Sequence, residues 1–592
     1  MKISPRLPRI SMRMTIALCL FSSLRLWAQS PGVGVNVWTW HNDNGRTGQN
    51  ASETVLTTAN VNKTNFGQLC SYPVDGQVYA QPLVLWDSVN NRNLVYVVTQ
   101  KDSIYLFDGT TTPVNKTCPL VASNTSLIPT GETAVDCHNI GHKDCKTISP
   151  SVGILGTPVI DEKTNHIYLV TYSQTATNYY HRIHALFTGL GGTTALAEDT
   201  VYNSPSIISS GSFNPTFSSV NHIQRPGLLL LPSTQSATPY VYVAFSMMDG
   251  ATNYPPGFIF RYYGDNLSQA PVVFTTEPDL SKGAGGGIWM DGAGLAAGID
   301  SVGGQTYLYF TTADGDFYTN TGGSLCTDCG DSFVKLTYGL GANSFFTPND
   351  QACRFINNPL TNPDLDFGSG GVLLIPDGLL TSWPYLAVSA DKNHNIWVMK
   401  RSAPGLYGGN SSCTGSNGNT ETIAGTGLYH NTPAFWQTSA STGYLYYASV
   451  GGPLSQYAVQ SSCTSGSPPV CSGPTISSQD PSGNTVNFNP GTTPSISSNS
   501  TTNGIVWAIS GSSVEGTNHG TLYAFNASTM AHLYDSNQCQ LGGDLMYSAT
   551  QFSVPTIAKG FVYVGTQSDN VTNVGTGAFY IFGKLPTQRT SC

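Results

Sequence analysis

The chain has 592 residues and a formal net charge of −9, with charged residues making up only 10% of the total. The acidic balance excludes a general surface for nucleic acid or anionic membranes. Glycine and proline contribute 63 and 35 residues, a composition typical of a turn-rich, all-β protein that works outside the cytoplasm.

The first 28 residues are expected to be a signal peptide. A basic start from Lys2 to Arg13 is followed by a short apolar stretch over residues 14–24. We expect cleavage after Ala28, which makes the mature protein secreted or periplasmic. No later segment of the sequence is long and apolar enough to span a membrane.

A two-strand pattern returns eight times along the rest of the chain. An apolar strand, often rich in tyrosine, is followed by a short gap and a second strand that ends in a turn, as in residues 94–98 and 103–109. We expect these two to be the inner strands of a blade. The repeat predicts one closed eight-bladed β-propeller of four-stranded antiparallel blades over residues 38–584. The central residues of the eight patterns are Tyr96, Tyr168, Tyr242, Leu308, Leu386, Tyr446, Trp507 and Tyr563.

Two stretches interrupt the pattern. Residues 408–427 are rich in Gly, Ser, Thr and Asn, and residues 461–503 contain several prolines and few large apolar side chains. Both are expected to be loop insertions between blades. Nothing in the sequence indicates an independent second domain.

Cysteine usage predicts disulfides. Apart from Cys19 in the export segment, the sequence holds twelve cysteines, and an even number in an exported chain favours pairing. Cys463 and Cys471 flank a Ser/Gly/Pro loop and are the best candidate for a local pair. The Cys326-x-x-Cys329 spacing favours a local disulfide or two separate partners over a zinc or haem site, because no second pair and no following histidine accompany it.

The densest set of nitrogen and sulfur ligands lies within nine residues. Cys137, His138, His142 and Cys145 could in principle bind zinc or copper. A loop this short is poorly suited to place four ligands tetrahedrally. We therefore favour disulfide-linked cysteines with exposed histidines.

Two pairs of carboxylates have loop spacing. Asp314 with Asp316, and Asp364 with Asp366, could each contribute to a calcium site. Neither pair belongs to a full twelve-residue calcium loop. Aspartate is also a common turn residue, and the turn role is the stronger interpretation.

The channel mouth is the predicted binding site, because segments from all blades converge there. Several of the segments that lead into a blade carry a proline, as at Gln81-Pro82 and Arg225-Pro226, which is tolerated at the start of a strand. Arg225 should pair with a carboxylate such as Asp291 or await an anionic ligand, since a buried unpaired charge is costly. The candidate residues are Gln81, Thr157, Arg225, Trp289, Asp291 and Asn431.

Several motifs together resemble a known family. They occupy residues 38–48, 74–83, 153–161, 286–289, 364–371, 504–509 and 552–556. The chain is similar, from about Trp38 to Gly583, to exported proteins with repeats like those of pyrroloquinoline quinone (PQQ) enzymes, in the quinoprotein alcohol dehydrogenase-like propeller superfamily.

The resemblance implies a specific cofactor site. In such dehydrogenases PQQ lies in the channel mouth between a tryptophan and a disulfide of adjacent cysteines, a calcium ion polarises the quinone, and an aspartate accepts the substrate proton. Trp289 is the stacking candidate that the resemblance points to, although packing within a blade is the stronger interpretation. This sequence has no adjacent cysteine pair.

Two functions remain open at this point. The favoured hypothesis is a non-catalytic, monomeric binding or scaffold protein that meets an unidentified protein or small-molecule ligand at a propeller rim. The alternative is a PQQ- and calcium-dependent dehydrogenase acting on alcohols or sugars, with both cofactors implied by the resemblance alone. Common hydrolase and phosphate-loop motifs are absent from the sequence.

Overall fold

The structure is a computed structural model. The residues that it describes are Met1, 36–113, 115–140, Cys145, 148–233, 238–248, 255–279, 285–354, 365–409, 415–417, 420–461, Cys463, Cys471, 474–511, 519–539, 543–568 and 575–590. The expected signal peptide lies outside the described residues, apart from Met1. Among the described residues, no helix has the length and apolar character that crossing a membrane requires.

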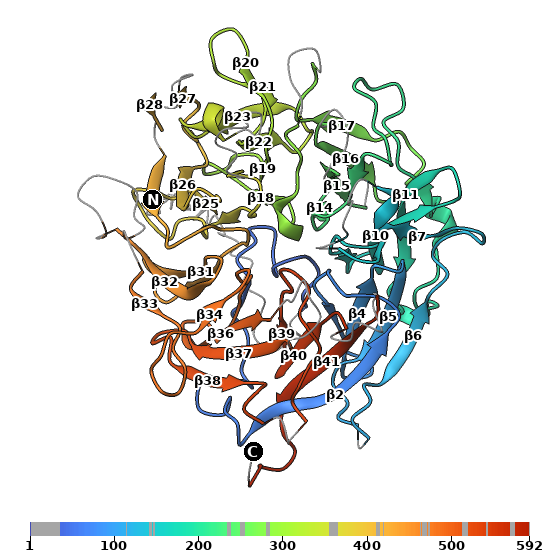
Figure 1. Ribbon diagram of the computed structural model, residues 1–592, viewed down its shortest axis with the longest axis vertical. Coiled ribbons are helices and arrows are strands. Elements are labelled where there is room, and N and C mark those ends of the chain that lie inside the picture. The colour runs from blue at the N-terminus through green and yellow to red at the C-terminus, as the bar shows by residue number, and fades with distance from the viewer. Residues whose placement is uncertain are drawn as a thin grey trace. The chain divides into compact units, whose positions relative to one another are not determined.

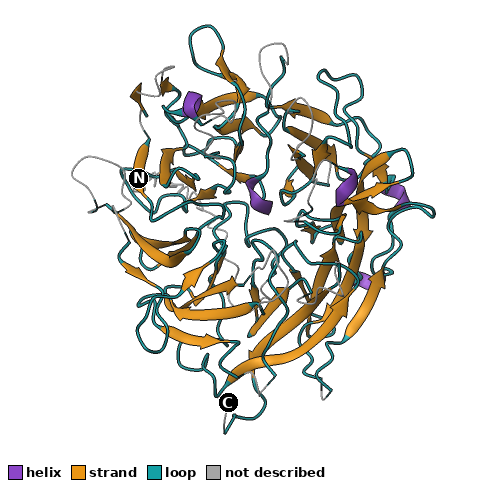
Figure 2. Ribbon diagram, viewed as in Figure 1, coloured by secondary structure: helices purple, strands orange, loops and turns teal. Residues whose placement is uncertain are grey.

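Residues 34–592 form one compact unit, and nearly all of its regular structure is β-strand (Figure 2). The strands build eight antiparallel blades that follow one another around a ring (Figure 1). In each blade the chain passes from a short innermost strand to a second, a third and, except in the last blade, a fourth, outermost strand. The prediction of one eight-bladed propeller is therefore confirmed.

The blades are numbered 1 to 8 from the first innermost strand. The innermost strands are β3 (Leu83–Asp87), β9 (Val159–Asp161), β14 (Leu229–Leu231), β18 (Ala296–Gly298), β24 (Leu373–Leu374), β30 (Ala434–Gln437), β35 (Ser495–Asn499) and β39 (Thr556–Ala558). The second strands are β4 (Arg92–Thr99), β10 (His166–Gln174), β15 (Tyr240–Met247), β19 (Tyr307–Thr311), β25 (Leu386–Ala390), β31 (Thr442–Ala448), β36 (Thr502–Ser510) and β40 (Phe561–Gly565). The third strands are β5 (Ser103–Asp108), β11 (Tyr179–Phe187), β16 (Phe258–Tyr263), β22 (Phe333–Thr337), β26 (Asn395–Lys400), β32 (Gly452–Gln460), β37 (Thr521–Asn526) and β41 (Gly577–Lys584). The outermost strands are β6 (Leu120–Asn124), β12 (Ser206–Ile207), β17 (Val272–Thr275), β23 (Ala342–Phe346), β29 (Glu421–Ala424), β33 (Ile476–Ser477), β38 (His532–Asp535) and β2 (Phe66–Val74).

The smaller elements lie between or beside the blades. They are β1 (Gln49–Asn50), β7 (Thr133–Asp136), β8 (Ser151–Val152), β13 (His222–Ile223), β20 (Phe317–Thr319), β21 (Cys326–Cys329), β27 (Gly408–Gly409), β28 (Gly415–Ser416) and β34 (Asn487–Phe488), with the short 3-10 helices η1 (Cys137–Asn139), η2 (Leu190–Gly192), η3 (Thr200–Tyr202), η4 (Met290–Gly292) and η5 (Gln351–Cys353).

The two strands of the sequence repeat occupy a different place from the one expected. They are the second and third strands of each blade, not the two innermost ones. The innermost strands are only two to five residues long and often start after a proline, so they leave little periodic signal in the sequence.

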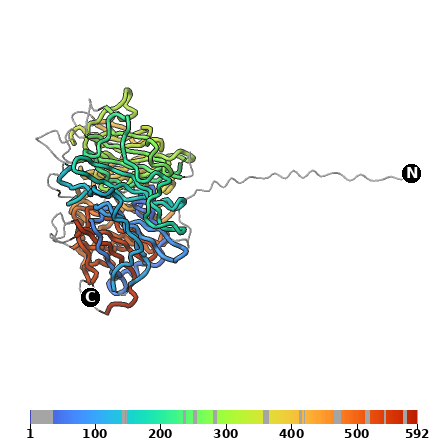
Figure 3. Tube along the Cα trace, turned by 90° about the vertical axis from the view of Figure 1, so that its right-hand side faces the viewer, coloured from blue at the N-terminus to red at the C-terminus, as the bar shows by residue number. Residues whose placement is uncertain are grey.

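The ring is closed by the two ends of the folded chain. The early strand β2 pairs with the last strand β41 and supplies the outermost strand of blade 8. Figure 3 shows the ring from the side, with the first and last parts of the described chain together at its lower end. Closure leaves no open first and last blade, so it removes the sheet edges along which propellers could otherwise aggregate.

The repeated tyrosines connect neighbouring blades. Five of the eight central residues are tyrosines whose hydroxyls donate to a backbone carbonyl of the next blade, at the residue directly after its third strand. Because these side chains are buried, each hydroxyl needs such an acceptor. The repeat in the sequence therefore reflects a repeated hydrogen bond between blades. The pairs are Tyr96 with Thr188 (2.7 Å), Tyr168 with Gly264 (3.2 Å), Tyr242 with Tyr338 (2.6 Å), Tyr446 with Ala527 (2.7 Å) and Tyr563 with Gly109 (3.1 Å).

Removing one of these hydroxyls should weaken the ring measurably. In Tyr96→Phe the buried carbonyl of Thr188 loses its donor, so the free energy of unfolding should fall by about 1–2 kcal/mol. Chemical denaturation of the two proteins measures the difference. Tyr72→Phe is the matched control, because the described structure gives the Tyr72 hydroxyl no hydrogen bond; its stability should change by less than about 0.5 kcal/mol. Equal losses in both variants would contradict the role assigned to Tyr96.

A segment before the first blade runs around the inside of the ring. Residues 37–50, the inner ring segment, contact the innermost strands or the residues beside them in blade order. The segment includes the first motif of the family resemblance, residues 38–48, and its trace runs along the inside of the ring (Figure 1). The backbone and amide hydrogen bonds join Val37 to Val84, Trp38 to Ile160, Asn44 to Leu230 and to Ala297, Gly45 to Leu374, Thr47 to Phe435, Gly48 to Ile496 and Asn50 to Ile557.

Two residues of the inner ring segment fit with little spare room. The ring of His41 bonds the carbonyls of Arg46 and Pro494, each at 2.8 Å, and burial lowers its pKa to about 4. Gly48 has a φ of +67°, and a Cβ there would lie 2.4 Å from Nε2 of His41. Any other residue at position 48 would therefore be strained and would displace the histidine.

Both stretches expected as loop insertions contain blade strands. Residues 408–427 include β29, the outermost strand of blade 5, and residues 461–503 include β33 and the innermost strand β35. The serines of β35 escaped notice as strand residues because they are polar. They are nevertheless buried, and Ser497 accepts a hydrogen bond from Nε1 of Trp507 at 2.8 Å.

Candidate binding site at the channel mouth

The predicted mouth residues all lie just before an innermost strand. Gln81, Thr157 and Arg225 precede the innermost strands of blades 1 to 3, Trp289 and Asp291 precede that of blade 4, and Asn431 precedes that of blade 6. Some of these residues form hydrogen bonds between blades, and others have charged or polar groups without a full set of partners.

Gln81 and Thr157 join blades. The side chain of Gln81 accepts a hydrogen bond from the backbone N–H of His41 at 2.7 Å and donates to Thr556 at 3.0 Å. Its own N–H donates to the hydroxyl of Thr157 at 3.0 Å. These bonds connect blades 1, 2 and 8 to the inner ring segment, so both residues have a structural role.

Arg225 is buried without a direct ion pair. It is 4% exposed, and its guanidinium donates to the carbonyls of Leu155 and Gln551 at 3.5 and 3.3 Å. The guanidinium carbon lies 5.7 Å from the centre of the Tyr79 ring. Burial lowers the pKa of Arg225, while Asp291 raises it. Within the described part of the chain, no carboxylate lies within 4.0 Å of this cation.

Asp291 sits in a strained turn beside Arg225. It belongs to η4 and has a φ of 46° and a ψ of 34°, a left-handed conformation that is uncommon for aspartate. Nε1 of Trp289 donates to its Oδ1 at 2.5 Å, and Nδ1 of His430 lies 3.7 Å from its Oδ2. Burial raises the pKa of Asp291 to about 8, and Arg225 opposes that shift. The carboxyl group is therefore mostly protonated at neutral pH.

Asn431 bridges blades 6 and 7 at the same end of the channel. Its side-chain amide donates to the carbonyl of Thr492, while its Oδ1 is buried and has no hydrogen-bond partner. A small cleft with a volume of about 10 Å³ lies next to this bridge, and Thr492 and Phe552 are among the residues that line it. The ring of Phe552 stacks on that of His430 with 6.1 Å between centres, which connects the cleft to Asp291.

Sequence reasoning missed His430, Phe552 and Tyr79 at the mouth. His430 stands beside the predicted Asn431, and its side chain is 28% exposed. The only feature of the sequence that pointed to His430 was its position directly before Asn431. Tyr79 and Phe552 lie within a few residues of Gln81 and Pro555, so a wider search around the prolines could have included them.

The predicted calcium pairs have different outcomes. Asp364 lies outside the described residues. Asp366 accepts a hydrogen bond from Ser369 at 2.6 Å and pairs with Lys392 at 3.1 Å, so its charge is already balanced. Asp314 and Asp316 flank Gly315 at the end of the second strand of blade 4.

The predicted disulfide Cys463–Cys471 is present. Cys326 and Cys329 form a local disulfide, which decides between the two alternatives left open above. Two further disulfides are described, Cys70–Cys118 and Cys137–Cys145, and Cys353 and Cys539 are also disulfide-bonded. Disulfides of this number are typical of an oxidising compartment outside the cytosol.

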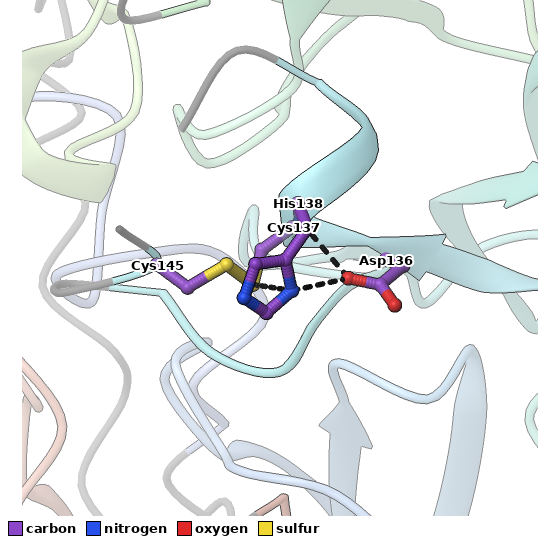
Figure 4. Close-up of side chains that lie close together, drawn as sticks. All are labelled: Asp136, Cys137, His138 and Cys145. Atoms are coloured by element: carbon purple, nitrogen blue, oxygen red, sulfur yellow. Dashed lines mark hydrogen bonds and ion pairs between the residues drawn. A yellow bond between two sulfur atoms is a disulfide. The ribbon is translucent and has the colours of Figure 1, made fainter. Parts of the chain in front are cut away.

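The cysteines of the nitrogen and sulfur cluster are bonded to each other. Figure 4 shows the Cys137–Cys145 disulfide beside His138 and Asp136, whose Nδ1 and Oδ1 atoms lie 2.9 Å apart. The side chain of His138 is 65% exposed. Oxidised cysteines cannot serve as thiolate ligands, so the preference for a disulfide with an exposed histidine is confirmed for the described residues, while His142 lies outside them. The disulfide packs in one apolar cluster with Tyr79 and Trp289.

No model of a protein family and no curated protein matches this chain. Solved structures do. The quinohemoprotein alcohol dehydrogenase of Comamonas testosteroni superposes with a TM-score of 0.52 at 12% identity, covering 94% of this chain and 82% of that one. Alcohol dehydrogenase ADHIIG of Pseudomonas putida HK5 gives 0.52 at 10% identity, covering 94% and 81%. A europium-containing methanol dehydrogenase gives 0.53 at 12% identity, covering 93% and 98%.

At such low identity these comparisons establish the fold. The chain has an eight-bladed propeller fold similar to that of these dehydrogenases, as the motifs in the sequence indicated. The activity has to be argued from the mouth residues themselves.

Proposed function

We propose that this protein is an exported propeller that binds a small anionic ligand at its channel mouth and acts as a binding or scaffold protein, without catalysis. The observation that carries the proposal is the state of Arg225. A buried guanidinium is costly without a counter-charge, and its nearest candidate, Asp291, is mostly protonated at neutral pH because its pKa is raised to about 8. A ligand carboxylate or phosphate would supply the missing charge.

The surroundings of Arg225 suit a small ligand. Trp289 and His430 are partly exposed, so they offer a route from solvent and flat rings for stacking. Oδ1 of Asn431 and Oδ2 of Asp291 accept no hydrogen bond, so they offer polar contacts that would fix the orientation of the ligand. Convergent polar groups beside aromatic rings are the usual lining of small-molecule sites. The disulfides support export to a secreted or periplasmic location.

Binding of simple anions tests the proposal. Calorimetry with inorganic phosphate, acetate and citrate should detect binding of at least one of them to the wild-type protein. Arg225→Met should weaken that binding at least tenfold, because the variant keeps the apolar stem and loses the charge. Thermal unfolding of the variant without anion separates binding from folding.

Arg92→Met is the matched control for this experiment. Arg92 pairs with Asp87 at 3.2 Å on blade 1, and its loss should leave anion binding unchanged. If Arg225→Met lowers stability and anion binding is the same in all three proteins, Arg225 only bridges blades and the proposed site is wrong.

The second candidate is a PQQ- and calcium-dependent dehydrogenase acting on alcohols or sugars. One observation favours it: Trp289 and a disulfide share an apolar cluster at the mouth, and the similar solved structures include alcohol and methanol dehydrogenases. PQQ is itself a planar anion, so it could use Arg225.

The residues present do not fit the PQQ-calcium pair. The cysteines of the mouth disulfide are eight positions apart in the sequence, whereas the resemblance implies adjacent cysteines. A calcium ion needs several oxygen ligands, but Asp366 is paired with Lys392 and Asp291 already accepts from Trp289. Incubation with PQQ and calcium, followed by absorbance and dye-reduction assays with alcohols and sugars, distinguishes the candidates. Dye reduction that depends on PQQ would replace the first proposal by the second.

A further inference from the structure

Four side chains around η1 could together hold a metal ion. They are Asp136, Cys137, His138 and Cys145, and we call them the mixed ligand cluster (Figure 4). Each offers one ligand atom, and the four atoms all lie within 4.8 Å of one another. In the part of the chain that the structure describes, this is the one group of three or more histidine, cysteine, aspartate or glutamate side chains that is assembled so closely.

The backbone holds three of the four ligands in place. The N–H of Cys137 donates to the carbonyl of Pro150 at 3.0 Å. Oδ1 of Asp136 accepts from the backbone N–H of His138 at 2.9 Å and so caps η1. The strand β7, which ends at Asp136, pairs with β8. None of these bonds involves the disulfide, so the three side chains should keep their places when the S–S bond is broken.

Two spacings in the cluster are close to those around zinc. At tetrahedral angles, the usual zinc bond lengths place a sulfur and a nitrogen ligand about 3.6 Å apart and a nitrogen and an oxygen ligand about 3.3 Å apart. Sγ of Cys137 lies 3.8 Å from Nδ1 of His138, and Oδ1 of Asp136 lies 2.9 Å from the same nitrogen. Small side-chain rotations are therefore enough to bring these three atoms to one ion.

The cluster is open to solvent on one side. The side chains of His138 and Asp136 are 65% and 50% exposed, whereas Cys137 and Cys145 are buried. Hydrogen bonds from His138 lower the pKa of Asp136, so this carboxylate is charged at neutral pH. A cation can approach from the side of these two residues and meet a negative charge there.

We propose that a dithiol reductant converts the mixed ligand cluster into a zinc site by opening the Cys137–Cys145 disulfide. Two thiolates, an imidazole nitrogen and a carboxylate oxygen then form a four-coordinate set of the kind that zinc binds in proteins. In the oxidised protein the cluster contains no thiolate, so its zinc affinity depends on the redox state of this one disulfide. The site does not depend on the proposed function.

The dithiol balances the redox step. Its two thiols lose two electrons and two protons and form a disulfide, while the S–S bond between Cys137 and Cys145 accepts them, breaks and becomes two thiols. Zinc then displaces both thiol protons into solvent, so zinc binding to the reduced protein should tighten as the pH rises. The bound ion replaces the disulfide as the link between η1 and Cys145.

Zinc titration of the reduced protein tests the proposal. The full chain is treated with dithiothreitol under native conditions, separated from it without oxygen, and alkylated in part to confirm by peptide mapping that Cys137 and Cys145 are thiols. Calorimetry with zinc sulfate should then show binding that the oxidised protein lacks. Cobalt in place of zinc should give the thiolate-to-metal absorption of a tetrahedral site.

Variants assign the bound zinc to the cluster. After reduction, Cys137→Ser combined with Cys145→Ser should bind one zinc fewer than the wild type. Cys463→Ser combined with Cys471→Ser is the matched control, because that disulfide also joins positions eight apart; this variant should bind as much zinc as the wild type.

His138→Gln keeps both cysteines and removes one ligand. It should weaken zinc binding at the cluster at least tenfold. Because the His138 side chain is mostly exposed, this variant still tests the site if the double serine variant does not fold. The proposal is wrong if the reduced wild type binds no more zinc than the oxidised protein, or if His138→Gln binds zinc as tightly as the wild type. It is also wrong if dithiothreitol leaves the Cys137–Cys145 disulfide intact in the folded protein.

Discussion

Arg46→Met is expected to lower the free energy of unfolding by about 4 kcal/mol. Arg46 is 0% exposed and holds the inner ring segment in the centre of the ring. Its Nε and Nη2 atoms donate to the carbonyl of Leu295 at 2.9 and 2.6 Å, and its Nη1 donates to Thr39 at 2.8 Å and to the carbonyl of Trp40 at 2.9 Å. Methionine fills similar space but leaves these buried acceptors without donors, and each such loss is costly.

Chemical denaturation of the purified variant measures this loss, with Arg92→Met as the control. The Arg92–Asp87 pair is partly exposed, so its removal should cost less than about 1 kcal/mol. Arg46→Lys should fall between wild type and Arg46→Met, since it keeps the charge but cannot make all the bonds of the planar guanidinium. Losses from Arg46→Met as small as those from Arg92→Met would show that the inner ring segment does not stabilise the propeller.

The repeat of blades could be predicted because it is local. The strand pattern around Tyr96 or Tyr563 is visible within about fifteen residues, and the need to satisfy each buried hydroxyl keeps tyrosine at matching positions. The innermost strands could not be read in the same way. A strand of two residues, such as Leu373–Leu374, has no period, and the polar strand Ser495–Asn499 does not alternate between apolar and polar residues.

The inner ring segment could not be predicted from the sequence for a different reason. Its contacts span almost the whole chain, as between Asn50 and Ile557, which are 507 positions apart. No local pattern in the sequence indicates that a polar side chain will form a hydrogen bond with a carbonyl hundreds of residues away. The motif around Arg46 and Gly48 was visible as part of a family resemblance. Its structural role, which is to form hydrogen bonds to the innermost strands of all eight blades, is seen only in the structure.

At the candidate site, too, the sequence shows local features but not burial. Arg225 could be singled out because a charge beside a proline at a strand start is unusual. Its partner Asp291 was named with it, yet the raised pKa that leaves the cation without a full counter-charge depends on burial, which the sequence does not reveal.

Asp291→Asn is expected to change how stability depends on pH. The pKa of Asp291 is raised from 3.8 to about 8 in the folded protein, chiefly by burial. Between those two values the folded state holds a proton that the unfolded state has released. The contribution of Asp291 to stability is therefore fully present below pH 4 and is lost as the pH rises towards 8, by up to about 1.4 kcal/mol per pH unit.

The asparagine variant should lack this loss. Asparagine keeps an oxygen that can accept from Trp289 and resembles the protonated acid, so the variant and the wild type should have similar stability near pH 4. As the pH rises to 8, the variant should become increasingly more stable than the wild type. Chemical denaturation of both proteins at pH 4, 6 and 8 measures the difference, and comparing the two cancels the titration of other buried acids such as Asp331.

The same experiment tests the argument for an anion site. Above pH 8 the ionised Asp291 can balance Arg225, so binding of citrate or phosphate to the wild type should weaken there, whereas the asparagine variant should keep its affinity because no charge develops. Asp480→Asn is the control, since Asp480 is partly exposed and hydrogen bonds within its own turn lower its pKa. The stability of this variant relative to the wild type should not change from pH 6 to 8. A stability difference for Asp291→Asn that does not grow with pH would mean that Asp291 is ionised at neutral pH, that it already serves as the counter-charge of Arg225, and that the mouth has no need of an anion.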